Sequence, residues 1–241
     1  MATPRKYLER YSDSLNRLCE ASRARVYAIL DLIDFSQADA DQIVRYVMDA
    51  AGSTFEASAS VAERLSCEFY DGLRAIEGID DGFKASPVRS YDSGRMAVSV
   101  KEAAEKATTT QKLIDGCCDA VDKETRRAAN VNTAGNSKKD PRKPKCARVP
   151  VGPSTCEWCV MLASLGFYYQ SEESASHSHP NCDCRIVPSF NEQREAIEGY
   201  DPKYYLDCYE NHDKHPEVRD AINARRRELR AERKAQEGGE E

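Results

Sequence analysis

The sequence has few of the features that mark membrane or secreted proteins. Of its 241 residues, 40% are hydrophobic and 8% are aromatic, and no apolar run approaches the roughly 20 residues that a membrane-spanning helix needs. The N-terminus opens directly into a charged helical pattern and has no apolar core of a signal peptide. We therefore expect a chain that is made and kept in a cytoplasm and has no membrane partner.

Histidine is also scarce, because the chain has 4 and none precedes His177. This absence excludes the cytidine-deaminase pattern, in which a His-x-Glu lies upstream of Pro-Cys-x-x-Cys. A His-Glu-x-x-His protease helix is missing as well, and no histidine lies near a nucleophile elbow. We predict no catalytic residues, no small-molecule substrate and no enzymatic activity.

Cysteine, by contrast, is abundant, with 10 residues. Without an export signal, thiols stay reduced or bind metal, so their spacing decides between the two. Cys156-x2-Cys159 and His179-x2-Cys182 are two close ligand pairs, and Cys184 is a fifth candidate because residues two apart on a strand point the same way. We predict one structural zinc ion, bound by Cys156, Cys159 and two or more of His179, Cys182 and Cys184. Disulfides or free thiols remain the alternative.

Most of the remaining chain shows apolar residues at helical spacing. The predicted helices cover Tyr7–Ile33, a short stretch around Ile43–Met48 that stops at Gly52, Phe55–Ile76, and Met96–Asn130 as one helix or two. Four cysteines within these patterns are interpreted as mostly buried apolar residues: Cys19, Cys67, Cys117 and Cys118.

The second half alternates short elements. We predict a short helix over Trp158–Leu165, strands at Phe167–Tyr169 and Arg185–Pro188, a short helix over Pro202–Tyr209, and a terminal helix from Pro216 to about Gln236. The sequence thus predicts an α+β protein that is mostly α. Its parts are a helical domain over 1–130, a basic linker over 131–147, a small cysteine/histidine-rich zinc-type α+β domain over 148–211, and a charged C-terminal helix over 212–241.

Charge is distributed unevenly along the chain. Between Asp31 and Asp81 there are twelve acidic residues and three arginines, whereas Lys123 to Arg148 has nine basic residues and two acidic ones. The predicted linker is rich in polar residues and proline. It carries a run that we call the basic patch, predicted to contact nucleic-acid phosphates weakly and without sequence preference: Lys138, Lys139, Arg142, Lys143 and Lys145. A solvated linker without a ligand is the alternative, and no interleaved aromatic residues indicate base stacking.

Four stretches together resemble a known family. They are Ala147–Ser164, Tyr169–Ser174, His179–Pro188 and Glu198–Pro202. They resemble the MuF-like minor capsid, or head morphogenesis, proteins of tailed phages, and are most similar to the versions in phages and prophages of actinobacteria. The family's hallmark is a Cys-x2-Cys followed by a His-Pro-x-Cys-x-Cys, and both parts are present here.

The resemblance implies a low-copy structural role in the virion head, with host cytoplasm as the location during assembly. It implies the portal and/or major capsid proteins as partners, together with packaged double-stranded DNA bound non-specifically. The maturation protease of some relatives is not expected here, because no histidine precedes residue 177, and the short tail after Pro202 leaves little room for the toxin domains of others. Two alternatives stay open. One is a zinc-stapled nuclease of the His-Asn-His type, because His179 and Asn181 lie beside the cysteines, and the other is a non-viral DNA-binding adaptor.

Overall fold

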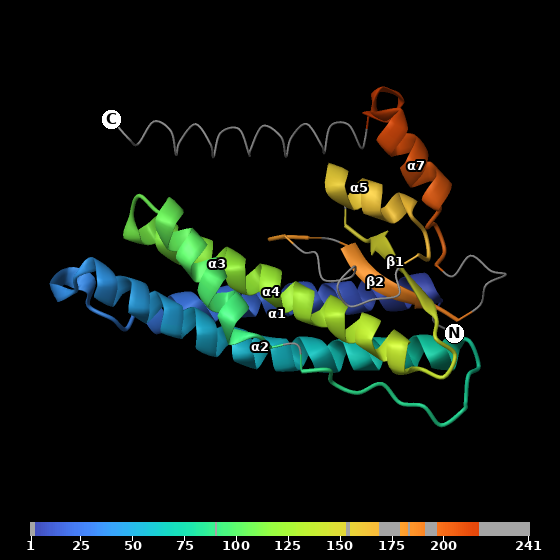
Figure 1. Cartoon of the computed structure of the whole chain (residues 1–241), viewed down its shortest axis with the longest axis horizontal. Helices are drawn as coiled ribbons and strands as arrows, with labels where there is room; N and C mark the ends of the chain where they lie inside the picture. Colours follow the sequence, from blue (N-terminus) through green and yellow to red (C-terminus); the bar gives the residue numbers. More distant parts are fainter. Residues whose placement is uncertain are drawn as a thin grey trace.

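Three long helices form the body of the protein. They are α1 (Pro4–Leu30), α2 (Ala40–Ile76) and α4 (Thr110–Lys139), which pack against one another, and the shorter α3 (Ser93–Lys106) packs on α2 and α4 (Figure 1). The computed structural model describes residues 3–89, 91–152, 155–168, 179–182, 184–190 and 197–216. The predicted fold class, α+β and mostly α, is confirmed.

The helices begin at residues that satisfy their free backbone N–H groups. Thr3, Asp92 and Thr109 each accept a hydrogen bond from a backbone N–H in the first turn of their helix. At α2, Asp39 and Gln42 exchange two hydrogen bonds in a capping box, at 2.8 and 2.9 Å. These caps are local, which explains why the starts of the helices can be recognised in the sequence.

One helix boundary differs from the predictions, and one alternative that the sequence left open is decided. α2 continues through Gly52, where a helix end was predicted, because buried Ala50, Ala51 and Phe55 hold this part of the helix against the bundle. That packing outweighs the cost of about 1 kcal/mol that glycine imposes inside a helix. The predicted fourth helical region is two helices, α3 and α4, with the break before the N-cap residue Thr109.

The predicted basic linker over 131–147 is wrong as a structural description. Helix α4 runs through it to Lys139, and Val131, Asn132 and Asn136 are buried there. The stretch lacks an apolar stripe because its buried side chains are polar and hydrogen-bonded. Strand β1 then begins at Lys145.

The partners of these polar side chains lie in an extended segment between α2 and α3. Asn136 accepts a hydrogen bond from the Ser86 N–H and donates one to the Ser86 carbonyl, both at 2.9 Å. Asn132 accepts from the Val88 N–H at 2.8 Å. The asparagines thus pair with this segment as a neighbouring strand would, so the segment lies on α4.

A two-stranded antiparallel sheet packs against the bundle. Strand β1 (Lys145–Pro150) pairs with β2 (Cys184–Ser189), with Ala147 opposite Val187. One face joins the core around Leu8 and Leu15 of α1. The opposite face, with Cys146 and Ile186, lies against Leu162 of α5 (Glu157–Ser164).

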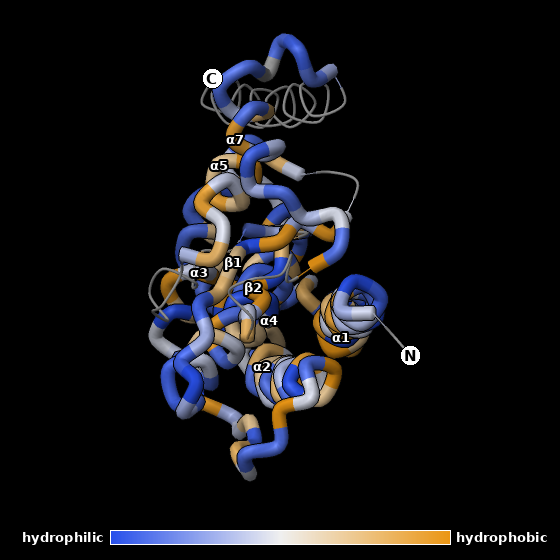
Figure 2. Tube along the Cα trace, turned by 90° about the vertical axis from the view of Figure 1, so that its right-hand side faces the viewer, coloured by the Kyte–Doolittle hydropathy of each residue, from blue (hydrophilic) through white to orange (hydrophobic). Residues whose placement is uncertain are grey.

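The layers therefore run from the bundle through the sheet to α5 and then α7 (Pro202–Glu210), as both views show (Figures 1 and 2). Two single-turn 3-10 helices, η1 (Phe35–Gln37) and η2 (His212–Lys214), complete the regular elements of the described ranges. Because the small unit shares its core with α1 and α2, a domain boundary at residue 130 does not separate two hydrophobic cores.

The remaining predictions for the second half have mixed outcomes. β2 and the two short helices α5 and α7 are present, whereas β1 was not predicted as a strand. Phe167 and Tyr168 form a turn after α5 and not a strand, and Tyr169 lies outside the described residues. The predicted terminal helix also lies outside them after Pro216. None of the helices in the described ranges is long and apolar enough to cross a membrane.

Candidate metal centre

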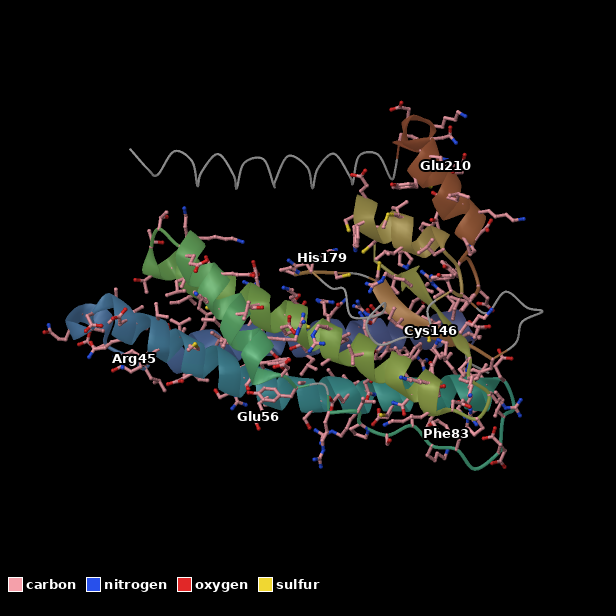
Figure 3. The ribbon with its side chains drawn as sticks, in the orientation of Figure 1. Arg45, Glu56, Phe83, Cys146, His179 and Glu210 are labelled. Carbon is pink, nitrogen blue, oxygen red and sulfur yellow. The ribbon has the colours of Figure 1, made fainter. Side chains whose placement is uncertain are left out.

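The five predicted metal ligands come from two short segments at one end of the sheet. Cys156 is the N-cap residue of α5, where its sulfur accepts a hydrogen bond from the Cys159 N–H at 3.4 Å. His179 and Cys182 lie in the turn before β2, and Cys184 is the first residue of β2. Figure 3 shows His179 in the middle of the molecule, between the long helices and α5, whereas Arg45 marks the far end of the bundle.

The structure brings all five side chains together. Nε2 of His179 lies 3.1 Å from Sγ of Cys156 and 3.7 Å from Sγ of Cys159. Sγ of Cys159 lies 3.7 Å from Sγ of Cys182. Their ligand atoms form two trios, one of Cys156, Cys159 and His179 and one of Cys159, Cys182 and Cys184, each with all atoms within 4.8 Å of one another. Cys159 belongs to both.

These separations fit tetrahedral coordination. With zinc–sulfur bonds of about 2.3 Å, two thiolates on one tetrahedral ion lie roughly 3.8 Å apart. The 3.7 Å separation between the sulfurs of Cys159 and Cys182 is close to this value. The clusters are therefore arranged so that they can hold a metal ion, and Cys159 is common to both possible ligand groups.

The ring of His179 is oriented as a metal-binding imidazole would be. Its Nδ1 lies 2.9 Å from the Pro180 carbonyl oxygen, to which an Nδ1–H donates. That hydrogen bond leaves Nε2 directed at the thiols, and an Nδ1–H donated to a carbonyl is the usual outer contact of a metal-bound histidine. Both ring nitrogens thus have partners.

The electrostatics of the cluster favour anionic sulfur. The pKa of Cys156 is lowered to about 4, chiefly by its hydrogen bond with Cys159 and then by His179. The pKa of Cys182 is also lowered, chiefly by Cys159. Hydrogen bonding to Cys156 raises the pKa of His179 to about 11. The pKa of Cys159 is raised, first by its hydrogen bond with Cys156, so its proton is shared with neighbouring thiolates. Thiolates are the form that binds metal.

Sequence reasoning missed a charged network that holds the second ligand segment on the bundle. Asp122 of α4 accepts a hydrogen bond from the Asn181 N–H at 2.8 Å and pairs with Arg126 through two bonds of 2.9 and 3.0 Å. Arg185 of β2 and Asn16 of α1 complete the network. One sequence signal for this network was available, because Asp122 and Arg126 lie four positions apart on a predicted helix and can form an ion pair. Such pairs are usually solvent-exposed, so this pair did not indicate a buried network.

The basic patch lies away from this cluster, at the C-terminal end of α4 and in the turn to β1. All five of its side chains are exposed. Arg142 forms an ion pair of 3.1 Å with Asp81. The patch is therefore a surface feature anchored on ordered backbone, and contact with nucleic acid remains a prediction.

The four cysteines that were predicted to be mostly buried apolar residues lie in the long helices. Cys19, Cys117 and Cys118 are buried as predicted, and Cys67 is half-buried. Burial raises the pKa of Cys117 to about 12, so this thiol stays protonated at neutral pH. His177 lies outside the described residues.

Comparison with known proteins gives one family and one relative. A family model described as VG15 protein matches residues 2–212. The chain belongs to the VG15 protein family. It is similar to the Gene 15 protein of Mycobacterium phage D29, with 29% identity over an alignment of 139 residues, and the match covers 43% of this chain and 48% of the relative.

The match with the D29 protein thus spans about half the length of that relative. No solved structure matches the chain. The family and the relative together support a phage protein of the actinobacteriophage type. Such a protein is located in the virion or in the infected cell.

Proposed function

We propose that this VG15-family chain is a minor capsid, or head morphogenesis, protein of a tailed phage, located in the head close to the portal and the packaged DNA. The observation that carries the proposal is the cluster of Cys156, Cys159, His179, Cys182 and Cys184, whose two sequence motifs resemble the MuF-like proteins and whose ligand atoms lie close together. The phage relative supports the same setting.

In this proposal the metal is a structural zinc ion. Cys156, Cys159, Cys182 and Cys184 pack together as a small cluster of their own. Because they come from two separate segments, a bound ion joins α5 to β2, and its binding free energy becomes part of the folding free energy. No chemistry of a substrate is assigned to it.

The geometry of His179 weighs against the nuclease alternative. A catalytic histidine of the His-Asn-His type must leave a ring nitrogen free to take a proton from water. Here Nε2 contacts the sulfurs of Cys156 and Cys159, and Nδ1 contacts the Pro180 carbonyl. The ring is thus placed as a ligand.

Charge supports a division of partners between two surfaces. The exposed basic patch suits the phosphates of packaged DNA, bound without sequence preference. The segment from Asp31 to Asp81, with twelve acidic residues and three arginines, repels DNA and suits a protein partner. The portal and the major capsid protein are the proposed protein partners.

Two measurements test the proposal. Quantitative mass spectrometry of purified mature heads of the encoding phage should find the chain at low copy number relative to the major capsid protein, and heads without the chain would contradict the virion role. Elemental analysis of chain purified under reducing conditions should give about one zinc per chain.

A matched pair of variants localises the metal. Cys159→Ser should abolish zinc binding, because Cys159 belongs to both trios. Cys117→Ser, a buried thiol of α4 outside the cluster, should leave the zinc content unchanged. Wild-type chain without zinc would contradict the metal centre, whatever the outcome for the head.

A further inference from the structure

Two buried guanidinium groups meet at one carbonyl of the ligand segment. Nη1 of Arg126 donates to the Cys182 carbonyl at 3.0 Å, and Nη1 of Arg185 donates to the same oxygen at 2.8 Å. Arg126 is 6% exposed and Arg185 is 1% exposed. Such a convergence of like charges at a buried site is costly unless an anion lies close by.

A single polar side chain of α1 bridges the two arginines. Oδ1 of Asn16 accepts from Arg126 at 2.7 Å and from Nη2 of Arg185 at 2.9 Å. The amide is neutral, so it satisfies hydrogen bonds without removing charge. In the described ranges the carboxylate of this network is Asp122, which pairs with Arg126 and accepts a hydrogen bond from the Asn181 N–H.

Among the residues that the structure describes, the network therefore carries one positive charge in excess, because two guanidinium groups face one carboxylate. A zinc ion bound by three thiolates and one neutral imidazole carries one negative charge, whereas four thiolates would give two. The excess charge of the network and the charge of a centre built from three cysteines and His179 are thus equal and opposite.

Resting on the metal centre of the proposed function, we propose that Arg126 and Arg185 are positioning residues for that centre. They fix the Cys182 carbonyl, and thereby the turn that carries His179 and Cys182, and their excess charge balances the anionic metal-thiolate group. Groups that orient metal ligands from outside the coordination sphere commonly contribute 10- to 100-fold to metal affinity.

The sharpest test is Asn16→Asp. A carboxylate at this position still accepts both guanidinium hydrogen bonds, and it neutralises the excess charge before any metal binds. The metal-free variant should therefore unfold at an equal or higher urea concentration than the wild type, while its zinc affinity falls roughly 10-fold. A residue with only a structural role would move stability and affinity in the same direction.

Two further variants complete the experiment. Arg126→Gln removes the charge and should weaken zinc binding roughly 10- to 100-fold. Ser14→Asp adds the same charge at a half-buried position of α1 two residues away from Asn16 and therefore on another face of the helix, and it should change the affinity less than about 2-fold. Zinc affinity is measured on the full chain by competition with a chromophoric chelator, and cobalt absorption reports whether the coordination is unchanged.

The outcomes separate the inference from the proposed function. Zinc affinity of Asn16→Asp equal to that of the wild type, or an equal loss in Ser14→Asp, overturns the role of the arginines while the metal centre stands. A wild-type chain that binds neither zinc nor cobalt overturns the metal centre and this inference together. Loss of affinity in Asn16→Asp and Arg126→Gln alone supports the inference.

Discussion

Asp140 is a decisive position for testing the packing of α4 against its neighbours. It follows the last residue of α4, is 0% exposed, and lies within the stretch that was predicted as a linker. Its carboxylate pairs with buried Arg74, accepts from the Tyr70 hydroxyl at 2.9 Å, and accepts from the Arg142 N–H at 2.8 Å. The substitution Asp140→Ala removes all of these contacts.

The expected cost follows from what remains behind. Removing one partner of a buried ion pair costs about 3–5 kcal/mol, because the other charge stays buried. Arg74 retains its second partner, Asp81, which keeps the cost of the broken pair near the lower end of that range. The hydroxyl of Tyr70 loses a buried acceptor and adds about 1 kcal/mol. We therefore expect Asp140→Ala to lower the free energy of unfolding by about 3–4 kcal/mol.

Urea unfolding followed by circular dichroism measures this loss. Lys138→Ser changes an exposed residue two positions earlier in the same segment, and its free energy of unfolding should stay within about 0.5 kcal/mol of wild type. A loss below about 1 kcal/mol for Asp140→Ala would refute the reasoning, because an unpacked linker tolerates loss of a carboxylate.

Three other predictions concern separate parts of the molecule. Gly52→Ala should raise the free energy of unfolding by about 1 kcal/mol, because no atom lies within 4 Å of the added Cβ. Gly116→Ala should lower the free energy of unfolding by about 1–2 kcal/mol, because its Cβ would lie 2.9 Å from the Cβ of Ala103 in α3. Urea unfolding of both variants checks the opposite signs. Iodoacetamide at pH 7 to 9 should label Cys156 first in the metal-free chain, because the pKa of Cys156 is lowered to about 4. It should leave Cys146 of the folded chain unlabelled, because burial raises the pKa of Cys146 to about 12. Labelling of both cysteines at equal rates, measured by mass spectrometry, would contradict this expectation. Replacing the five residues of the basic patch with serine should flatten the salt dependence of DNA binding and keep the zinc content, and an unchanged salt slope would leave the patch without a role in DNA binding.

The sequence predicted those features whose evidence is local. The stripe of α1, with Leu8, Leu15 and Val26 at helical spacing, is buried as expected, because one helix face needs only its own periodicity to be recognised. The ligand pairs of the cluster were found in the same way, from spacings of two residues.

What the sequence did not predict depends on contacts between distant segments. Asn132 and Asn136 look like linker residues until their partners Val88 and Ser86 are known, which lie 44 and 50 positions away. Strand β1 shows no alternation, because both of its faces are buried, one on α1 and the other under α5. Arg126 and Arg185 look like surface charges, since guanidinium groups are seldom buried without a partner.

The amide of Asn16 also constrains the order in which the chain can fold during synthesis. Its partner Arg185 lies 169 positions further along the chain. At a translation rate of about 5–20 residues per second, roughly 10–30 s pass between the synthesis of the two residues. During that interval the apolar face of α1 around Leu8 and Leu15 lacks its neighbour Val187 of β2, and such transiently exposed apolar surface is prone to aggregation.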